Sequence, residues 1–138
     1  MSYKIIAKYI KKIDFDISKP DKFLTLTKDI SNYKFKIDIK SNRYKDNIIE
    51  VQTTLNLAPK NKETEYINAL ATYSTLVELD KDLTDKKKLE EIILVKIPHE
   101  IYPELRKIFM FIFESSGFKK VKVSQKIDFD KLYEGRKI

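Results

Sequence analysis

A helical pattern of apolar positions runs from Ile97 to Phe118. Apolar residues recur there on one face of a predicted α-helix: Ile101, Leu105, Ile108, Phe109, Ile112 and Phe113. Pro98 suits the first turn of this helix, whereas Pro103 must start, kink or restart it, because proline has no backbone N–H to donate. The segment Ser115–Gly117 predicts the end of the helix, since glycine readily takes a positive φ. A helix with such a face needs a broad apolar surface to pack on.

Segments that precede this helix alternate apolar and polar residues with the period of a β-strand. They run from Tyr3 to Phe15, from Tyr33 to Lys40 and from Ile49 to Leu57. One apolar and one polar face per strand is typical of an antiparallel sheet. A fourth segment, Glu65–Leu79, is apolar on both faces in places, and its Thr, Tyr and Val residues favour a strand. We expect Ser41–Asn47 to be a hairpin loop between the second and third strands.

The first strand has an irregular apolar pattern. Residues of one parity form its predicted apolar face: Tyr3, Ile5, Ala7, Tyr9, Ile13 and Phe15. Ile6 and Ile10 interrupt the opposite, polar face, so that face is either partly covered or binds something. Local packing of a few isoleucines and contact with a second subunit explain these two positions equally well.

The remaining segments complete an α+β prediction. Ser18–Asp29 has mixed polarity and a proline, and we interpret it as a loop with a short turn. Thr84 or Asp85 can cap a short helix before the long one, and Asp128 can cap a final helix. The order of strands and then helices predicts a four-stranded antiparallel sheet with a long C-terminal helix, kinked near Pro103, and a shorter final helix on one side. We expect residues 1–138 to form a single domain.

Composition narrows the classes of function. Lys and Arg number 28 against 21 Asp and Glu, and the net charge of +7 would suit a basic nucleic-acid-binding domain. Only three of these cations are Arg, the residue that binds phosphates and bases in a bidentate manner. We therefore interpret the charge mainly as a solvated face and keep nucleic-acid binding as an alternative. With no cysteine and no apolar run near the roughly 20 residues that cross a bilayer, the sequence predicts a soluble, cytoplasmic protein without membrane insertion.

Candidate catalytic residues are sparse. His99 is the only histidine, so a metal site would have one nitrogen ligand and otherwise oxygen ligands. Gly117 and Gly135 are the only glycines, which excludes a glycine-rich phosphate loop, and the serines before Gly117 lack the context of a nucleophile elbow. We expect neither an enzyme activity nor a metal or cofactor.

Aromatic and apolar residues exceed what a small core requires. The chain has eight Tyr and eight Phe, and several apolar positions fall on strand faces that the predicted helices would leave open: Ile6, Ile10, Tyr66, Leu70 and Leu76. Apolar surface of this kind usually meets another protein.

Several motifs resemble those of the SecB export-chaperone family. PHEIYPELR (98–106) is similar to the family's Pro-Asn-x-Leu-Phe-Pro-Tyr-Ala-Arg, and Ser116-Gly117-Phe118 is similar to its Arg-Gly-x-Phe. IDFDKLY (127–133) resembles Val-Asn-Phe-x-x-Leu-Tyr, and YIKKIDFDISKP (9–20) resembles the family's N-terminal stretch, which contains aromatic residues, Ile, Ser, Phe, an acidic residue and Pro. The resemblance covers nearly the whole chain.

This resemblance implies a holdase that binds unfolded polypeptides without ATP, as in preprotein export, and that assembles as a homotetramer, a dimer of dimers. A SecB-like chaperone dedicated to one client, such as an antitoxin, is the alternative. The positions of the family's client groove correspond to Tyr66, Leu70, Phe113, Phe118, Phe129, Leu132 and Tyr133.

Family members also present carboxylates on the sheet to the basic tail of the translocation motor. Here Asp16 keeps its charge, but Lys12 and Ala69 stand where acidic residues are expected. A reversed charge would turn attraction to the motor into repulsion.

Overall fold

The computed structural model describes residues 3–17, 19–29, 33–59, 67–118, 121 and 123–136. Its strands are β1 (Tyr3–Ile17), β2 (Tyr33–Lys45), β3 (Ile48–Pro59) and β4 (Ile67–Leu79). They form one antiparallel sheet in the order β1-β4-β3-β2. The helical segments are α1 (Pro20–Asp29), α2 (Lys86–Glu91), the π-helical η3 (Ile92–Lys96), α3 (Ile97–Ser115) and α4 (Phe129–Arg136). The predicted α+β fold, with a long C-terminal helix and a short final one, is confirmed.

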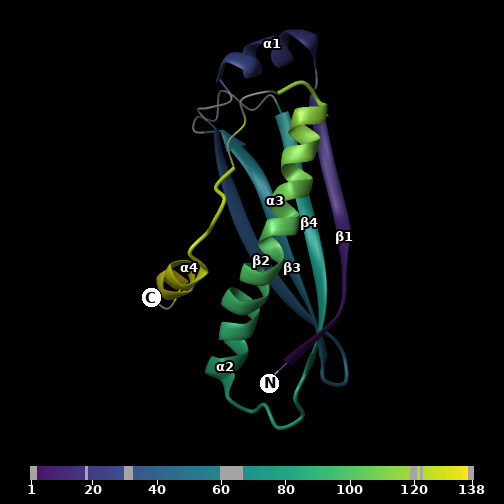
Figure 1. Ribbon diagram of the computed structural model, residues 1–138, viewed down its shortest axis with the longest axis vertical. Coiled ribbons are helices and arrows are strands. Elements are labelled where there is room, and N and C mark those ends of the chain that lie inside the picture. Colours follow the sequence, from purple (N-terminus) through teal and green to yellow (C-terminus); the bar gives the residue numbers. More distant parts are fainter. Residues whose placement is uncertain are drawn as a thin grey trace.

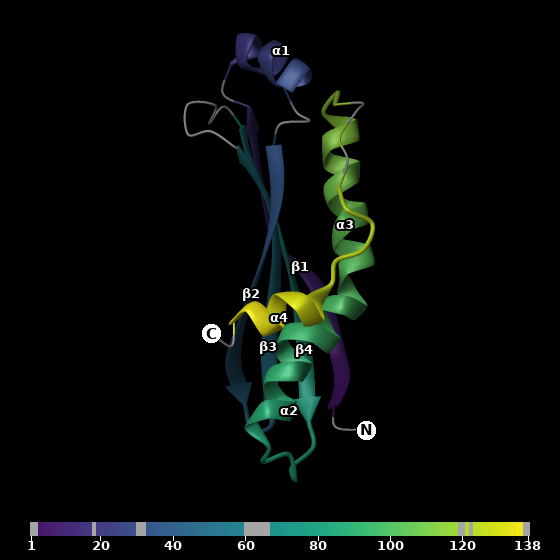
Figure 2. The ribbon, with the colours of Figure 1, turned by 90° about the vertical axis from the view of Figure 1, so that its left-hand side faces the viewer.

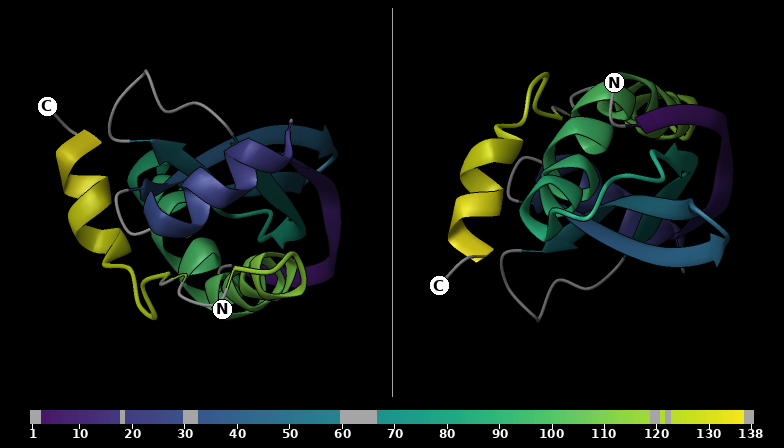
Figure 3. Two further views of the ribbon diagram at one scale, coloured as in Figure 1. Left: turned by 90° about the horizontal axis from the view of Figure 1, so that it is seen from above. Right: turned by 90° about the horizontal axis from the view of Figure 1, so that it is seen from below.

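The long helix and the sheet form two layers. In Figure 1, α2 and α3 follow one another along the strands, and Figure 2 shows the helix and the sheet side by side. α1 lies across the end of the sheet that is close to the C-terminal end of α3. The end views in Figure 3 place α4 at the side of the sheet away from β1. No helix among the described residues is long and apolar enough to cross a membrane.

The long helix has no loop between α2, η3 and α3. In η3 the backbone N–H of Ile97 donates to the carbonyl of Ile92, the wider spacing of a π-helix. Pro98 follows in the first turn of α3, as predicted, and Pro103 lies inside α3. The π-helical segment thus lies directly before the point where the missing N–H of Pro98 already interrupts the ladder of hydrogen bonds.

The core fills the space between α3 and the sheet. The residues of one α3 face are fully buried: Ile101, Leu105, Phe109 and Phe113. They belong to one cluster with central-strand residues such as Leu55, Ala69 and Ala71. Burying a large apolar side chain contributes about 1.5–3 kcal/mol. This face therefore holds the helix on β3 and β4, as its spacing predicts.

Local signals at the helix ends are confirmed. The Asp85 carboxylate accepts a hydrogen bond from the N–H of Lys87 at 3.0 Å and caps α2. The Asp128 carboxylate accepts one from the N–H of Lys131 at 3.1 Å at the start of α4. Gly117 ends α3 with φ 102°, where other residues would be strained.

The interpretation of Ser18–Asp29 as a loop is wrong, because the structure has the ten-residue helix α1 there. Pro20 stands at its first position, where a missing N–H costs nothing. The negative charge of Asp21 in the first turn interacts favourably with the helix dipole. Phe23 packs against Phe118, with ring centroids 5.0 Å apart. This contact with a distant part of the chain stabilises a helix whose own sequence signal is weak.

The predicted parity of the first strand is also wrong over part of its length. Register shifts, between Ile5 and Ala7 and between Ile10 and Lys12, each set one extra residue of β1 against β4. As a result Ile10 pairs with Tyr73, whose hydroxyl donates to Glu104 of α3 at 2.7 Å. Ile10 therefore belongs to the helix side of the sheet.

Tyr9 lies on the outer face instead, because it pairs with Ser74 and both side chains bond to Glu50. Ala7, which pairs with Leu76, is on the outer face as well. Packing within the chain does not cover the irregular isoleucines, because Ile6 and Ile10 remain 43% and 47% exposed.

The hairpin between β2 and β3 is tighter than expected. Residues 41–45 continue β2, and only Asp46 and Asn47 form the turn, with Asp46 at φ 52°. The guanidinium of Arg43 donates to the carbonyl of Asp46. This extension of β2 has polar residues on both faces, so the sequence shows no alternating pattern there. It lies beyond the core and is held by backbone pairing.

Glu50 is the centre of a polar cluster on the outer face of the sheet. Its carboxylate accepts hydrogen bonds from Lys11 Nζ at 2.8 Å, Ser74 Oγ at 2.6 Å, Gln52 Nε2 at 3.1 Å and the Tyr9 hydroxyl at 3.2 Å. The bonds from Lys11 and Ser74 lower the pKa of Glu50 to about 2, although burial opposes them. The charged form of Glu50 thus stabilises the fold where β1, β4 and β3 meet.

Replacing Glu50 by Gln should lower the free energy of unfolding by about 2 kcal/mol at neutral pH. The folded-state pKa is below the ordinary value of 4.5. The contribution is therefore fully present above that value and is lost as the pH falls toward about 2. Urea unfolding of both proteins across this interval should show the difference shrinking. The matched control Glu78→Gln, at an exposed position of β4, should change stability little. A Glu50→Gln difference that does not shrink at acid pH would contradict this role.

Candidate functional site

An apolar groove lies where α4 meets β2 and η3. It is lined by Ile37 and Ile39 of β2, Leu94 of η3, and Leu132 and Tyr133 of α4. The hollow itself is small, about 40 Å³. Leu132 stands at its edge and is 45% exposed, so an apolar group that settled on the groove would bury surface that the chain alone leaves in water.

α4 packs through one side and leaves Leu132 at the edge of that side. Phe129 and Tyr133, one turn apart, are both buried, whereas Leu132, three residues after Phe129 on the same side of the helix, is half-exposed. The Tyr133 hydroxyl donates to Glu90 of α2 at 3.0 Å. Burial and this carboxylate raise the pKa of Tyr133, so its hydroxyl stays protonated and ties α4 to the long helix.

The predicted client-binding residues do not form one surface. Leu132 and Tyr133 line the groove. Phe129 is next to them on α4 but only 2% exposed, and its ring meets the edge of Tyr102 with centroids 6.0 Å apart. Of these α4 residues, only Leu132 is open to a partner without a rearrangement.

The other predicted positions lie elsewhere. Phe113 and Phe118 are buried at the far end of α3, with ring centroids 5.6 Å apart. Leu70 is half-buried on the outer face of the sheet, where it lines a different hollow. Tyr66 lies outside the described residues.

The outer face around Leu70 is mainly basic. Lys12, Lys36 and Lys40 line its hollow of about 550 Å³, together with Asp38 and several uncharged side chains. Asp16, the predicted docking residue, is exposed on β1 and pairs with Asn68 of β4. It therefore lies near a surface on which lysine side chains are more numerous than carboxylates.

Sequence reasoning missed three groove residues: Ile37, Ile39 and Leu94. Strand alternation places both isoleucines on the apolar face, but it cannot show that α4 lies beside them. The signal that could have found them is the free edge of β2, which a later element can cover.

The lining of the groove suits apolar contact with a partner rather than catalysis. Among the described residues, no group of three or more His, Cys, Asp or Glu side chains is placed to hold a metal ion. The groove lining contains apolar side chains and one tyrosine whose hydroxyl is already bonded to Glu90.

Comparison with known proteins shows which family this chain belongs to. The family model of the preprotein translocase subunit SecB matches residues 1–138. The putative protein-export protein SecB of Pelagibacter ubique (strain HTCC1062) is 36% identical over 135 residues, which are 98% of this chain and 96% of that protein. The chain belongs to the SecB family. Membership of the SecB family supports a chaperone role.

A solved structure shares the SecB-like fold. A SecB-like chaperone of Mycobacterium tuberculosis, in complex with a ChAD peptide from the HigA1 antitoxin, superposes with a TM-score of 0.67. The match covers 91% of this chain and 88% of that one, at 9% sequence identity.

Stability measurements should separate the groove residue from the core residue on α4. Phe129→Ala should lower the free energy of unfolding by about 3–5 kcal/mol, because it leaves a cavity beside Tyr102. Leu132→Ala should cost less than about 1 kcal/mol, because the side chain is already half in water. Urea unfolding of both variants measures this. Equal losses would show that Leu132 is a core residue.

Proposed function

We propose that this protein is an ATP-independent holdase that binds unfolded polypeptides at the groove of Ile37, Ile39, Leu94, Leu132 and Tyr133. The observation that carries the proposal is the exposure of Leu132 above an apolar lining, in a chain of the SecB family. Unfolded chains offer apolar side chains in many sequences, and burial of about 50 Å² of apolar surface contributes about 1.3 kcal/mol. Several such contacts along a client would hold it without any chemistry.

The edge of the sheet supports the same proposal. β2 is the last strand of the sheet and forms one wall of the groove. An edge strand has backbone groups that no neighbour pairs with, and an extended client segment can bond to them whatever its sequence. Backbone pairing and apolar contact together suit a binder with broad specificity.

A homo-oligomer, a dimer of dimers, is part of the proposal. β1 forms the other edge of the sheet, and Ile10 and Ile13 on its helix side are 47% and 46% exposed. Phe111 is exposed on α3. A second copy packed there would cover apolar surface that one chain leaves in water.

The export role and the dedicated-client role share this groove. The Pelagibacter relative, a putative protein-export protein, favours general export, and a cytoplasmic location is part of this proposal. The antitoxin peptide bound by the structural neighbour favours a dedicated client as the second candidate. A basic tail on the translocation motor would be repelled by Lys12, Lys36 and Lys40, so docking through Asp16 is the least supported part of the export role.

The holdase proposal predicts that the protein suppresses aggregation of an unfolded client at about stoichiometric ratio without nucleotide. Leu132→Asp should weaken client binding at least tenfold, about 1.4 kcal/mol, because it places a charge in the apolar groove and leaves the buried anchor Tyr133 in place. The matched control Leu24→Asp, at an exposed apolar position of α1, should bind as the wild type does.

Measuring DNA binding beside client holding tests the nucleic-acid alternative. A basic DNA-binding domain would bind single-stranded or duplex DNA with submicromolar affinity that falls steeply with salt. Tight, salt-sensitive DNA binding without client holding would overturn the proposed function. Client binding that is unchanged in a folded Leu132→Asp variant would move the site to the outer face around Leu70.

The proposed assembly predicts that the 16.4 kDa subunit runs as a dimer or tetramer in size-exclusion chromatography with light scattering. Ile10→Lys combined with Ile13→Lys should shift the mass toward one subunit, because charges on both partners would face each other. A monodisperse monomer of the wild type at micromolar concentration would contradict the assembly.

A further inference from the structure

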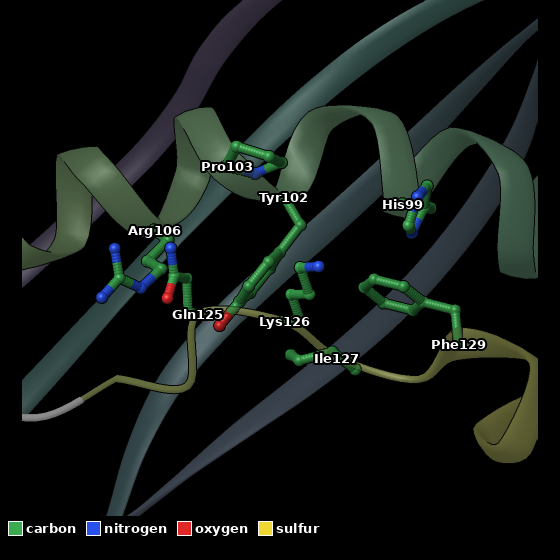
Figure 4. Close-up of a pocket in the computed structure, with 8 residues that line it drawn as sticks. All are labelled: His99, Tyr102, Pro103, Arg106, Gln125, Lys126, Ile127 and Phe129. Carbon is green, nitrogen blue, oxygen red and sulfur yellow. The ribbon is translucent and has the colours of Figure 1, made fainter.

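Another hollow, of about 420 Å³, lies between α3 and the segment that leads into α4. It is lined on one side by His99, Pro103 and Arg106 of α3, and on the other by Lys126, Ile127 and Phe129 (Figure 4). It shares no lining residue with the apolar groove. The two hollows are neighbours on α4, because Phe129 lines one and Leu132 lines the other, about one helical turn away.

The lining of this hollow is basic. Arg106, Lys126 and His99 contribute nitrogen donors, and no carboxylate lines it. Arg106 is half-buried, and its Nε donates to the carbonyl of Val123 at 3.1 Å. Across the described chain its two terminal nitrogens have no hydrogen-bond partner. A guanidinium fixed through Nε thus keeps both terminal NH₂ groups available to an anion.

The wall opposite α3 is also fixed. The Tyr102 hydroxyl donates to the carbonyl of Ser124 at 2.5 Å. Burial raises the pKa of Tyr102, although the positive charge of Arg106 opposes this. The hydroxyl therefore stays protonated and holds the linker, which is the segment of residues 123–128 that leads into α4. Because two α3 side chains bond to successive linker carbonyls, the hollow exists before any ligand binds.

We propose that this hollow binds a carboxylate of the client polypeptide, either an acidic side chain or the C-terminal carboxylate. The inference rests on the proposed function and assigns a second contact to the same client. Arg106 can bond a carboxylate in a bidentate manner, and Lys126 adds a positive charge beside it. Pro103 and Ile127 would contact the apolar part of the residue that carries the carboxylate. This mixture of apolar walls and cations fits a peptide carboxylate better than a bare phosphate.

The test compares three forms of one apolar, aromatic peptide of about twelve residues, with affinities for the full-length protein measured by calorimetry. One form has a free C-terminal carboxylate, one is amidated, and one is amidated with a single internal Asp. At low salt the free acid, the Asp form or both should bind at least about fivefold tighter than the plain amide, and the preferred form identifies the source of the carboxylate.

Variants assign this preference to the hollow. His99→Gln combined with Lys126→Gln removes two basic side chains of the lining and leaves the bond between Arg106 and Val123 in place. This double variant should abolish most of the preference for the carboxylate. Arg106→Gln should do the same, but it also removes the bond to Val123. The matched control Lys107→Gln, an exposed lysine of α3 that does not line the hollow, should keep the preference.

Failure of this inference can be told apart from failure of the proposed function. Equal affinity for all three peptides, each weakened by Leu132→Asp, would overturn the carboxylate site and leave the holdase proposal standing. If no peptide binds, N-acetylphenylalanine and its amide probe the hollow directly by NMR. Shifts of the amides of residues 99–106 and 123–129 with the acid alone would support the site, and their absence would overturn it. Displacement of the acidic peptide by a short single-stranded DNA would also overturn the peptide assignment.

Discussion

The attachment of the linker to α3 is the constraint on which the position of α4 depends. α4 has only eight residues, too few to be stable by itself in water. Hydrogen bonds from Tyr102 and Arg106 to linker carbonyls, and the burial of Val121 and Val123, fix the path that leads into it. Without these contacts α4 would not be held beside β2, and neither the groove nor the basic hollow would have a second wall.

Packing and the proposed client binding use different residues of α4. Phe129 and Tyr133 are buried and anchor the helix, whereas Leu132 is half in water. One short helix can serve both purposes because Leu132, three residues after Phe129, lies on the same side as the two anchors but at its edge, where it stays partly in water. The groove is therefore largely formed without a client, and little ordering entropy opposes the first contact. Tight packing of the anchor is compatible with weak, general binding at its surface.

Local signals in the sequence predicted most of the helices and strands. Contacts between distant segments determined the features that the sequence did not reveal. Asp85, Asp128 and Gly117 acted within one turn of the chain, so their roles could be predicted. α1 could not, because its packing depends on Phe23 meeting Phe118. The bulges of β1 are a property of its pairing with β4 and are invisible in one strand. For the same reason the resemblance to the SecB family named Leu132 and Tyr133 but not the wall that Ile37 and Ile39 provide.

In the proposed function, charge and apolar surface make separate contributions to client recognition. Apolar contact at the groove accepts many sequences, because it depends on area rather than on pattern. Electrostatic complementarity instead affects which chains arrive and in what orientation. The long lysine side chains of the outer face would attract acidic segments only diffusely, since each keeps its rotational freedom. Arg106 differs from them, because its Nε bond to Val123 fixes the guanidinium. A fixed guanidinium beside an apolar groove can orient a client, whereas mobile lysines can only enrich it near the surface.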